Sequence, residues 1–459
     1  MADPTPDAPE LTVDALAAAA DSGDAARLYA VIEPAPPLDV VRALARLEDE
    51  QQARTMTLLA PADAAELLLH MADVQAADVL EELAPADAAA ILHALPSNDE
   101  VDIVNQLHPD DAAAILAELE PAEATTVRTL ADYDENVAGG LMVAEYLAFR
   151  ADEAVAVVVE ELRREADTYA DYQVQYVYVV DAARRLVGVV RLRDLLLARP
   201  GATVARVMID EPLAVRDDAP LDELEIFFDD HPFLGVPVVD ADGRLVGLLR
   251  RSDVEEALTE RADSDYRKAQ GIVGGEELRS MPVLLRAGRR LSWLSTNIVL
   301  NLVAASVIAA YQDTLAAVIA LAVFLPIISD MSGCSGNQAV AVSMRELALG
   351  VVRPNEALHV WGKEISVGLI NGTVLGLLLG AVAWWWQGNP WLGLVVGAAL
   401  ALNTVVAVSI GGSVPLVLKR FGLDPALSSG PILTTVTDLC GFFLSLSFAT
   451  VLLARLVAA

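Results

Sequence analysis

Hydrophobic residues are distributed unevenly along the chain. From Leu291 onward they form five long apolar stretches, whereas before that point apolar and polar residues alternate at helical or strand spacing. A bilayer core of about 30 Å is crossed by a helix of roughly 20 apolar residues. The pattern therefore predicts an all-α, five-helix transmembrane domain over residues 291–459, with spans at 292–311, 315–341, 364–386, 391–418 and 430–455.

Basic residues between the apolar stretches predict how the chain crosses the membrane. They precede the first span, separate the second from the third, and separate the fourth from the fifth: Arg286, Arg289, Arg290, Arg345, Arg353, Lys363, Lys419 and Arg420. The connections at 312–313 and 387–390 contain no lysine or arginine, so the positive-inside rule places them outside. We therefore expect a multi-pass protein of the cell inner (plasma) membrane, with a cytoplasmic N-terminus and an external C-terminus.

An internal repeat with a period of 24 occupies the N-terminal part. It reads LAPADAAELLLHM from Leu59, LAPADAAAILHAL from Leu83 and LHPDDAAAILAEL from Leu107. Each copy places proline at a helix start, aspartate two residues later, and then apolar residues at helical spacing. This predicts a cytoplasmic α-helical repeat domain over residues 1–132. The helix dipole is the simplest explanation of Asp87 and Asp111, because acids are favoured in the first turn.

A second repeat has an offset of 59. The segment VVDAARRLVGVV at 179–190 recurs as VVDADGRLVGLL at 238–249, and each copy reads as strand, turn and strand before a helix. This resembles a tandem α/β pair of CBS domains, here over residues 133–200 and 201–262. Such modules commonly bind adenosyl nucleotides through a hydroxyl three residues after the glycine. Arg191 and Arg250 occupy that position, which argues against ATP binding.

Acidic residues continue along the helix that follows the second repeat. We predict that a connecting, plug-like helix over residues 263–290 carries this acidic run toward the membrane. A charge run is usually a solvated helix face. If it faces the acidic helical domain, however, the like charges repel unless a hard cation lies between them, and carboxylates suit Mg²⁺ or Ca²⁺. The candidate cation ligands are Asp253, Glu256, Asp265, Asp230, Asp240, Asp263, Asp87 and Asp111.

The overall charge supports a cationic partner. The net charge is −34, and the first 290 residues hold 58 of the 65 acidic residues but only 25 of the 31 basic ones. Nucleic acid is excluded as a partner, because phosphate binding needs clustered lysine and arginine. An enzyme is not expected either, since the chain has no Walker-type loop and its five histidines lack metal-ligand spacing.

Polar groups inside the apolar stretches are costly and mark functional sites by default. Asp438 is the sole ionisable residue of the fifth stretch before Arg455, and the second stretch breaks its apolar pattern at Leu325-Pro326. Proline and glycine free backbone carbonyls that can line an ion path. The candidate path residues are Asp438, Pro326, Asp330, Gly333, Gly336, Asn337, Gln338 and Thr435. Two alternatives stay open: Asp438 is a protonated residue bonded between helices, and the glycines only pack helices closely.

These features, in this order, resemble the MgtE family of magnesium channels and transporters over nearly the whole chain. The resemblance rests on three motifs: Pro326, Gly333, Gly336 and Gln338; Leu423, Asp424, Pro425, Ala426, Leu427, Pro431 and Asp438; and Ala138, Gly139, Gly140, Leu141 and Met142. Two positions depart from the family. Cys334 stands where an asparagine is usual, and Asp330 adds a carboxylate.

The resemblance implies a homodimeric, Mg²⁺-selective uptake channel in the lipid bilayer, driven by the membrane potential. Its pore would run between the second and fifth spans of both subunits. Mg²⁺ would also be a regulatory ligand that closes the pore from the cytosol, with Asp253, Glu256 and Asp265 as the sensor residues best supported by the family. Two other functions remain open: a broader transporter of Co²⁺, Ni²⁺ or Zn²⁺, and a non-conducting CBS-based membrane sensor.

Overall fold

A computed structural model describes residues 11–166, 169, 175–199, 201–275, 277–279 and 281–458. The first ten residues of the expected helical domain therefore lie outside the described residues. Two compact units are present, residues 1–260 and residues 261–459. Each is treated below by itself.

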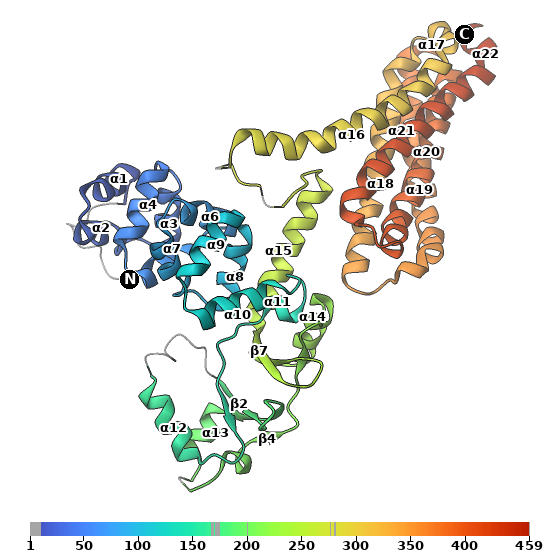
Figure 1. The fold of residues 1–459 in the computed structure, drawn as a ribbon. Helices are drawn as coiled ribbons and strands as arrows, with labels where there is room; N and C mark the ends of the chain where they lie inside the picture. Colours follow the sequence, from blue (N-terminus) through green and yellow to red (C-terminus); the bar gives the residue numbers. More distant parts are fainter. Residues whose placement is uncertain are drawn as a thin grey trace, which may run out of the picture. The chain divides into compact units, whose positions relative to one another are not determined.

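The first part of unit one is a stack of short helices, the blue to cyan elements of Figure 1. Proline occupies the first turn of α5, α7 and α9, as the 24-residue repeat predicts, because a helix start needs no N–H there. The helices are α1 Val13–Ser22, α2 Ala25–Ile32, α3 Pro37–Leu44, α4 Asp49–Leu58, α5 Pro61–Leu68, α6 Asp73–Glu81, α7 Pro85–Leu92, α8 Ser97–Gln106, α9 Pro109–Glu118, α10 Pro121–Ala131 and α11 Ala138–Leu141.

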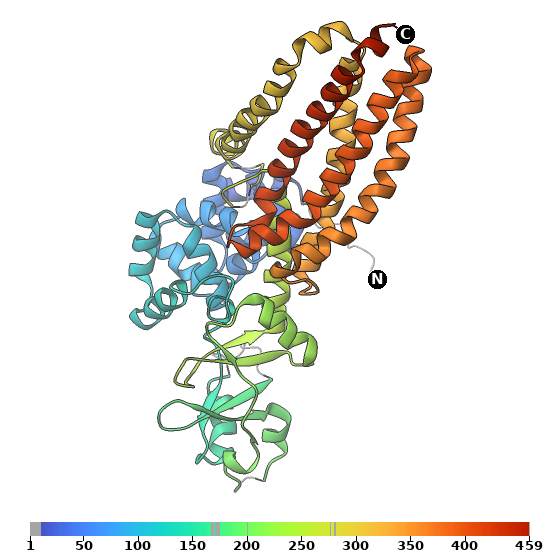
Figure 2. The same cartoon turned by 90° about the vertical axis from the view of Figure 1, so that its right-hand side faces the viewer.

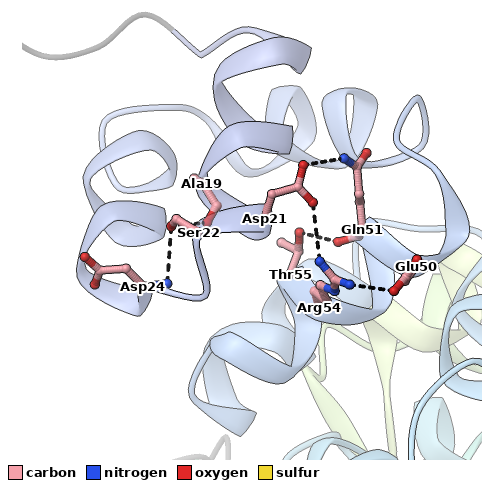
Figure 3. Close-up of polar contacts among 8 residues, drawn as sticks. All are labelled: Ala19, Asp21, Ser22, Asp24, Glu50, Gln51, Arg54 and Thr55. Carbon is pink, nitrogen blue, oxygen red and sulfur yellow. Dashed lines mark hydrogen bonds and ion pairs between the residues drawn. The ribbon is translucent and has the colours of Figure 1, made fainter.

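Polar side chains join α1 and α4 of this stack at the surface. Figure 3 shows Asp21 of α1 accepting from Gln51 at 3.0 Å and pairing with Arg54 of α4 at 3.5 Å, while Arg54 also pairs with Glu50. Such exposed pairs contribute at most about 1 kcal/mol each. Many acids of this domain are therefore ordinary surface partners.

Two small sheets follow, with the strand pairing that the 59-residue repeat predicts. Strand β2 pairs antiparallel with β3, and β6 with β7, so that Val177 lies opposite Val190 and Val236 opposite Leu249. The elements are β1 Ala148–Arg150, α12 Val155–Arg164, β2 Tyr176–Val180, β3 Leu186–Arg191, α13 Leu192–Leu197, a 3-10 turn Val204–Arg206, β4 Ile209–Asp210, β5 Val215–Arg216, α14 Leu221–Asp230, β6 Gly235–Val239 and β7 Leu245–Arg250.

The two sheets belong to different hydrophobic cores. The second sheet and α14 share one continuous core with the helical stack, through residues such as Leu130, Leu221 and Leu249. The first sheet has its own core around Val158 and Val177. The second sheet is thus the one fixed to the helical domain.

The connecting helix differs from its predicted form. Helix α15 spans Arg251–Ala269, and the next helix starts only at Val283, so residues 263–290 are not one helix. Glycines at positive φ end α15, since Gly271, Gly274 and Gly275 have φ of 79°, 99° and 93°. Arg286, Arg289 and Arg290 consequently lie inside the first long helix of unit two rather than before it.

Unit two is a bundle of long apolar helices, and α18 to α21 lie alongside one another in Figures 1 and 2. Among the described residues, four helical segments are long and apolar enough to cross a membrane: Val283–Ala310, Pro354–Gln387, Pro390–Arg420 and Pro425–Val451. The helices are α16 Val283–Ala310, α17 Gln312–Ala317, α18 Leu321–Ala348, a 3-10 turn Pro354–Glu356, α19 Ala357–Gln387, α20 Pro390–Arg420, α21 Pro425–Val451 and α22 Leu453–Ala458.

Two of the predicted spans need correction. The second falls on α17 and α18, and α18 is too polar to count among the four, although it has 28 residues. Helix α18 runs through Pro326 without interruption, and this proline removes one backbone hydrogen bond there because it has no N–H. The fifth span starts at Pro425 rather than near residue 430, because Asp424 caps the helix by accepting from the backbone N–H of Ala426 at 2.8 Å.

Candidate functional site

The carboxylate of Asp438 lies where α21 packs against α18. It accepts a hydrogen bond from the hydroxyl of Ser329, which is buried on α18. Asp438 itself is half-buried, and α18, α20 and α21 contact one another around it. The second and fifth predicted spans therefore meet at Asp438, the acid that the sequence singled out in the fifth span.

A second polar contact holds the backbone next to this acid. Asn403 on α20 is fully buried and donates from Nδ2 to the carbonyl of Thr437 at 3.0 Å. Its Oδ1 atom has no hydrogen-bond partner. Thr435 faces the same side of α21 as Asp438, and its hydroxyl donates to the carbonyl of Pro431 at 2.7 Å.

The two glycines of α18 differ in their surroundings. A Cβ at Gly336 would lie 2.7 Å from Leu433 and 3.0 Å from the Ala407 carbonyl, whereas a Cβ at Gly333 would meet only the Thr437 hydroxyl, at 3.8 Å. Gly336 therefore permits the close crossing of α18 with α20 and α21, as small residues do in membrane helices. Gly333 instead leaves space beside the Thr437 hydroxyl.

The other predicted path residues of α18 lie on a different face. Pro326, Asp330, Cys334, Asn337 and Gln338 are all exposed, and their spacing places them along one side of the helix. We call these five residues the polar stripe. The structure does not bring Asp330 to Asp438.

Acidic residues from three helices gather in unit one. Asp99 and Asp102 both lie on α8. Mainly because they are largely buried, the pKa of Asp99 is raised to about 6 and the pKa of Asp102 to about 8. The negative charges of Asp73, Asp253 and Glu256 raise the pKa of Asp99 further, while Arg250 lowers it. Asp73, Asp99 and Glu260 add to the shift of Asp102. We call Asp73, Asp99, Asp102, Asp253, Glu256 and Glu260 the acidic cluster.

Two of the predicted cation ligands belong to this cluster. Asp253 is 6% exposed and pairs with Arg250 at 2.7 Å, and Arg250 also donates to Asn98 at 3.2 Å. Glu256 is exposed on the same helix. Arg250 is therefore the arginine that pairs with the buried aspartate of the cluster.

The remaining predicted ligands lie elsewhere. Asp240 accepts from the backbone N–H groups of Asp242 and Arg244 in the β6–β7 turn, at 2.9 and 2.8 Å. Asp87 and Asp111 occupy the first turns of α7 and α9, where the helix dipole accounts for them. Asp230 ends α14 and is exposed, as is Asp263 on α15.

Asp265 lies in unit two, beside the start of α21. The pKa of Asp265 is raised, mainly because the residue is half-buried. The Lys268 ammonium lowers this pKa, and the Asp424 carboxylate raises it. Lys268 and Asp424 form an ion pair at 3.3 Å. The end of α15 is thus linked to the residue that caps the helix carrying Asp438.

Sequence reasoning missed Ser329, Asp73, Asp99 and Asp102. Serine is common inside membrane helices, so nothing marked Ser329 as a neighbour of Asp438. Asp99 and Asp102 are three residues apart and share one face of α8, which is the signal that was present. This spacing indicates an acidic cluster only when the position of that face near the acids of α15 is known.

Comparison with known proteins identifies the family. Residues 325–448 match the family described as MgtE, a divalent cation transporter. Residues 35–136 match the MgtE intracellular N domain, and residues 138–201 and 204–260 match the CBS domain. The magnesium transporter MgtE of Thermus thermophilus is 38% identical over 340 residues, which cover 73% of this chain and 74% of that protein. The chain belongs to the MgtE family.

Further MgtE relatives agree. The magnesium transporters MgtE of Enterococcus faecalis and Bacillus subtilis are 32% and 30% identical, and each alignment covers 73% of both proteins. A crystal structure of the cytosolic domain of the Mg²⁺ channel MgtE in complex with ATP is 35% identical, covers 53% of this chain and 99% of that chain, and superposes with a TM-score of 0.49. The resemblance and the fold class are confirmed: this is a multi-pass MgtE transporter with an intracellular N-terminal domain, and not an enzyme.

The cleft between the two CBS domains is narrow in this MgtE protein. Its cavity is about 30 Å³ and is lined by Tyr146, Tyr176, Tyr178 and Arg250 among others. That is room for about one or two water molecules. Arg250, which lines this cleft, is also engaged with Asp253 and Asn98. That ATP does not bind here stays a prediction.

Proposed function

We propose that the chain is a Mg²⁺ uptake channel of the inner (plasma) membrane, with an external C-terminus. Asp438 carries this proposal, because it supplies a carboxylate at the contact of α18 and α21 in an otherwise almost uncharged bundle. The names of the MgtE relatives support Mg²⁺ as the ion. The membrane potential supplies about 2.3 kcal/mol per charge per 100 mV, and twice that for a divalent ion.

The polar stripe supports a homodimer with the pore between its subunits. Five polar or helix-distorting residues are exposed on one side of α18, which is costly against lipid. A second copy placed against this side would turn both stripes toward a shared aqueous path. Asn337, Gln338 and Asp330 would then contact the waters that Mg²⁺ retains during passage.

The acidic cluster supports closure by cytosolic Mg²⁺. Its carboxylates repel one another between the helical domain and α15, so a cation that binds there favours the compact arrangement. Among the described residues, no three potential ligands stand ready to hold a bare ion, which suits Mg²⁺ with bound waters. Family resemblance adds Asp265 to this sensor.

The gate would be moved by the end of α15. Lys268 contacts Asp424, and Asp424 caps α21, so a shift of α15 reaches the helix of Asp438 without an intermediate element. ATP and a second coupled ion are not required. This link gives the sensor a physical route to the pore.

Uptake of Mg²⁺ into proteoliposomes tests the function. We expect Mg²⁺ flux in the intact chain and its near loss in Asp438→Ala. Asp313→Asn, which removes an acid from α17 of the same bundle, is the matched control and should retain flux. An Asp438→Ala variant with unchanged flux would refute the pore assignment, and absence of flux in the intact chain would favour the non-conducting sensor.

A broader divalent transporter is the second candidate, and Cys334 favours it. This thiol is exposed on the polar stripe, four residues after Asp330. Thiolates prefer softer metals such as Co²⁺ and Zn²⁺. Competition of these ions with Mg²⁺ uptake, compared between the intact chain and Cys334→Asn, separates the two candidates: competition that vanishes in Cys334→Asn supports the broader one.

A further inference from the structure

One end of the membrane bundle is rich in tryptophan. Four of the six tryptophans of the chain lie within residues 384–391, where α19 ends and α20 begins. Trp384, Trp385 and Trp386 are exposed, Trp385 by 85%, whereas Trp391 is half-buried against the core of the bundle. We call these four residues the tryptophan belt. Tryptophan gathers at the boundary between lipid and water, because its ring is largely apolar and its N–H is polar.

Arg455 lies against this belt. Its Cζ atom is 4.3 Å from the centroid of the Trp391 ring, which is a cation–π contact. Asn389 fixes the backbone on both sides of this contact. Its side chain accepts from the N–H of Trp391 at 3.0 Å, and its Nδ2 donates to the carbonyl of Leu456 at 3.0 Å. Helix α22, which carries Arg455, is thus tied to the start of α20.

The described residues leave the N–H groups of Arg455 without an acceptor. The side chain is exposed, and in the described part of the chain no carboxylate pairs with it and no oxygen accepts from it. Asp313 is exposed on α17, which lies beside α22 at this end of the bundle (Figure 1), yet it does not pair with Arg455. Stacking on an indole covers one face of a guanidinium and leaves the five N–H donors at its edge free.

The position of this arginine opposes the charge bias of the bundle. Lys419 and Arg420 end α20, whereas the connection at 387–390, at the other end of that helix, contains no lysine or arginine. Basic residues favour the cytosolic ends of spans. Arg455 lies at the opposite end, and no described acid balances it. An anionic partner from outside the protein fits this charge.

We propose that Arg455 and the tryptophan belt bind the head group of an anionic phospholipid. The planar guanidinium matches two oxygens of the lipid phosphate. The exposed indoles contact the glycerol and the upper acyl chains, which a soluble anion does not have. A head group without an ammonium, such as that of phosphatidylglycerol, is favoured because the guanidinium repels an ammonium.

The bound lipid has a consequence for transport. This consequence and the assignment to the outer leaflet rest on the proposed function, but the binding itself does not. With an external C-terminus, Arg455 lies on the side from which Mg²⁺ enters. An unpaired guanidinium there repels an approaching divalent cation, and a bound phosphate cancels that charge. The lipid would therefore keep this end of the bundle accessible to cations.

Quenching of tryptophan fluorescence by a brominated lipid tests the site. The full chain with Trp293→Phe and Trp361→Phe keeps the tryptophan belt as its fluorophores. It is placed in phosphatidylcholine nanodiscs that contain brominated phosphatidylglycerol as a minor lipid, and quenching is read against the unbrominated lipid. We expect this lipid to be enriched about three- to fivefold beside the belt, as one arginine near the surface attracts an anionic lipid.

Three variants locate the enrichment. Arg455→Gln should abolish it. Arg455→Lys, which keeps the charge but loses the planar fork, should retain a part of it. Arg420→Gln removes an arginine from the opposite end of α20 and should keep all of it. The lysine variant ensures that a folding defect in Arg455→Gln does not decide the result.

Each other outcome overturns the site. Equal enrichment of brominated phosphatidylcholine, or unchanged enrichment in Arg455→Gln, refutes an anionic lipid at Arg455. Enrichment that inorganic phosphate removes, but chloride of equal ionic strength does not, assigns the guanidinium to a soluble anion. Unchanged quenching with an altered oligomer mass of Arg455→Gln, measured by light scattering, assigns Arg455 to a contact with a second copy of the chain. None of these measurements involves transport, so failure here leaves the pore assignment intact, and a chain that conducts no Mg²⁺ can still bind the lipid.

Discussion

The two acidic regions of this protein solve opposite problems. In the membrane bundle, one carboxylate, Asp438, stands among neutral donors such as Ser329. In unit one, the acidic cluster places several carboxylates together, and the pKa values of Asp99 and Asp102 rise because these two are buried and lie among like charges. Under the proposed function, a single charge would bind a passing cation weakly enough to release it. A crowded group would store repulsion that a cation relieves, as a switch requires.

The largest expected effect tests the single-charge side of this comparison. Asp438→Asn should lower Mg²⁺ flux roughly 100-fold, because losing about 2–3 kcal/mol of attraction corresponds to about two factors of ten. Ser329→Ala keeps the charge and removes only the donor, so its flux should fall less than about tenfold. Proteoliposome uptake measures both. Equal losses in the two variants would mean that the hydrogen bond, rather than the charge, is what matters.

The stored repulsion predicts that the cytosolic unit is less stable at high pH. Asp99, Glu100 and Asp102 have folded-state pKa values above their unfolded ones, so folding is favoured most at acidic pH. Stability is then lost as pH rises through about 6 and about 8. Between about pH 5 and about pH 9 the free energy of unfolding should fall by several kcal/mol, on the order of 1.4 kcal/mol for each pH unit between the unfolded and the folded pKa of a group.

Urea unfolding of residues 1–269 in EDTA, followed by circular dichroism, measures this loss. Asp102→Asn should flatten the dependence, and Mg²⁺ should reduce it because the ion binds the ionised form. A stability that rises with pH over this range would contradict the cluster.

How much of this could be foreseen differs between the two regions. The repeats predicted the helical stack and both strand pairs, because proline positions and strand alternation are local signals. Asp438 was predictable because an ionisable residue in an apolar stretch is rare. Its partner Ser329 was not, since the rotation of α18 depends on the close packing of Gly336 against Gly411 of α20 and Leu433 of α21.

The acidic cluster was predictable only in part. Composition indicated that acidic side chains would lie close together. It did not indicate which ones, because 58 acidic residues precede residue 291. Asp253 and Glu256 were assigned correctly to the helix that carries them, whereas Asp99 and Asp102 depend on long-range packing. The prediction of one continuous helix over 263–290 is wrong, because the glycines at 271, 274 and 275 adopt positive φ and interrupt it.

An intermediate effect tests the crowded side of the comparison. Asp99→Asn combined with Asp102→Asn should raise the cytosolic Mg²⁺ concentration needed for half closure by about tenfold, since roughly 1.4 kcal/mol of cation binding is lost. Maximal flux should not change. Asp87→Asn combined with Asp111→Asn removes the same charge from two helix starts and is the control. Liposome flux at graded internal Mg²⁺ gives the midpoint. If both pairs shift it equally, total charge and not the cluster controls closure.

The smallest expected effect tests the connection between the two regions. Lys268 and Asp424 are 40% and 38% exposed at their side chains, so their ion pair contributes less than about 1 kcal/mol. Lys268→Met should therefore raise the Mg²⁺ concentration for half closure by only about two- to threefold. Lys268→Arg keeps the charge and should restore the midpoint, whereas Lys363→Met removes a lysine from α19 and should leave it unchanged. Because Asp424 also caps α21, the lysine is the informative side of the pair to change. A midpoint in Lys268→Met that equals that of Lys363→Met would show that α15 reaches the pore helix by another route.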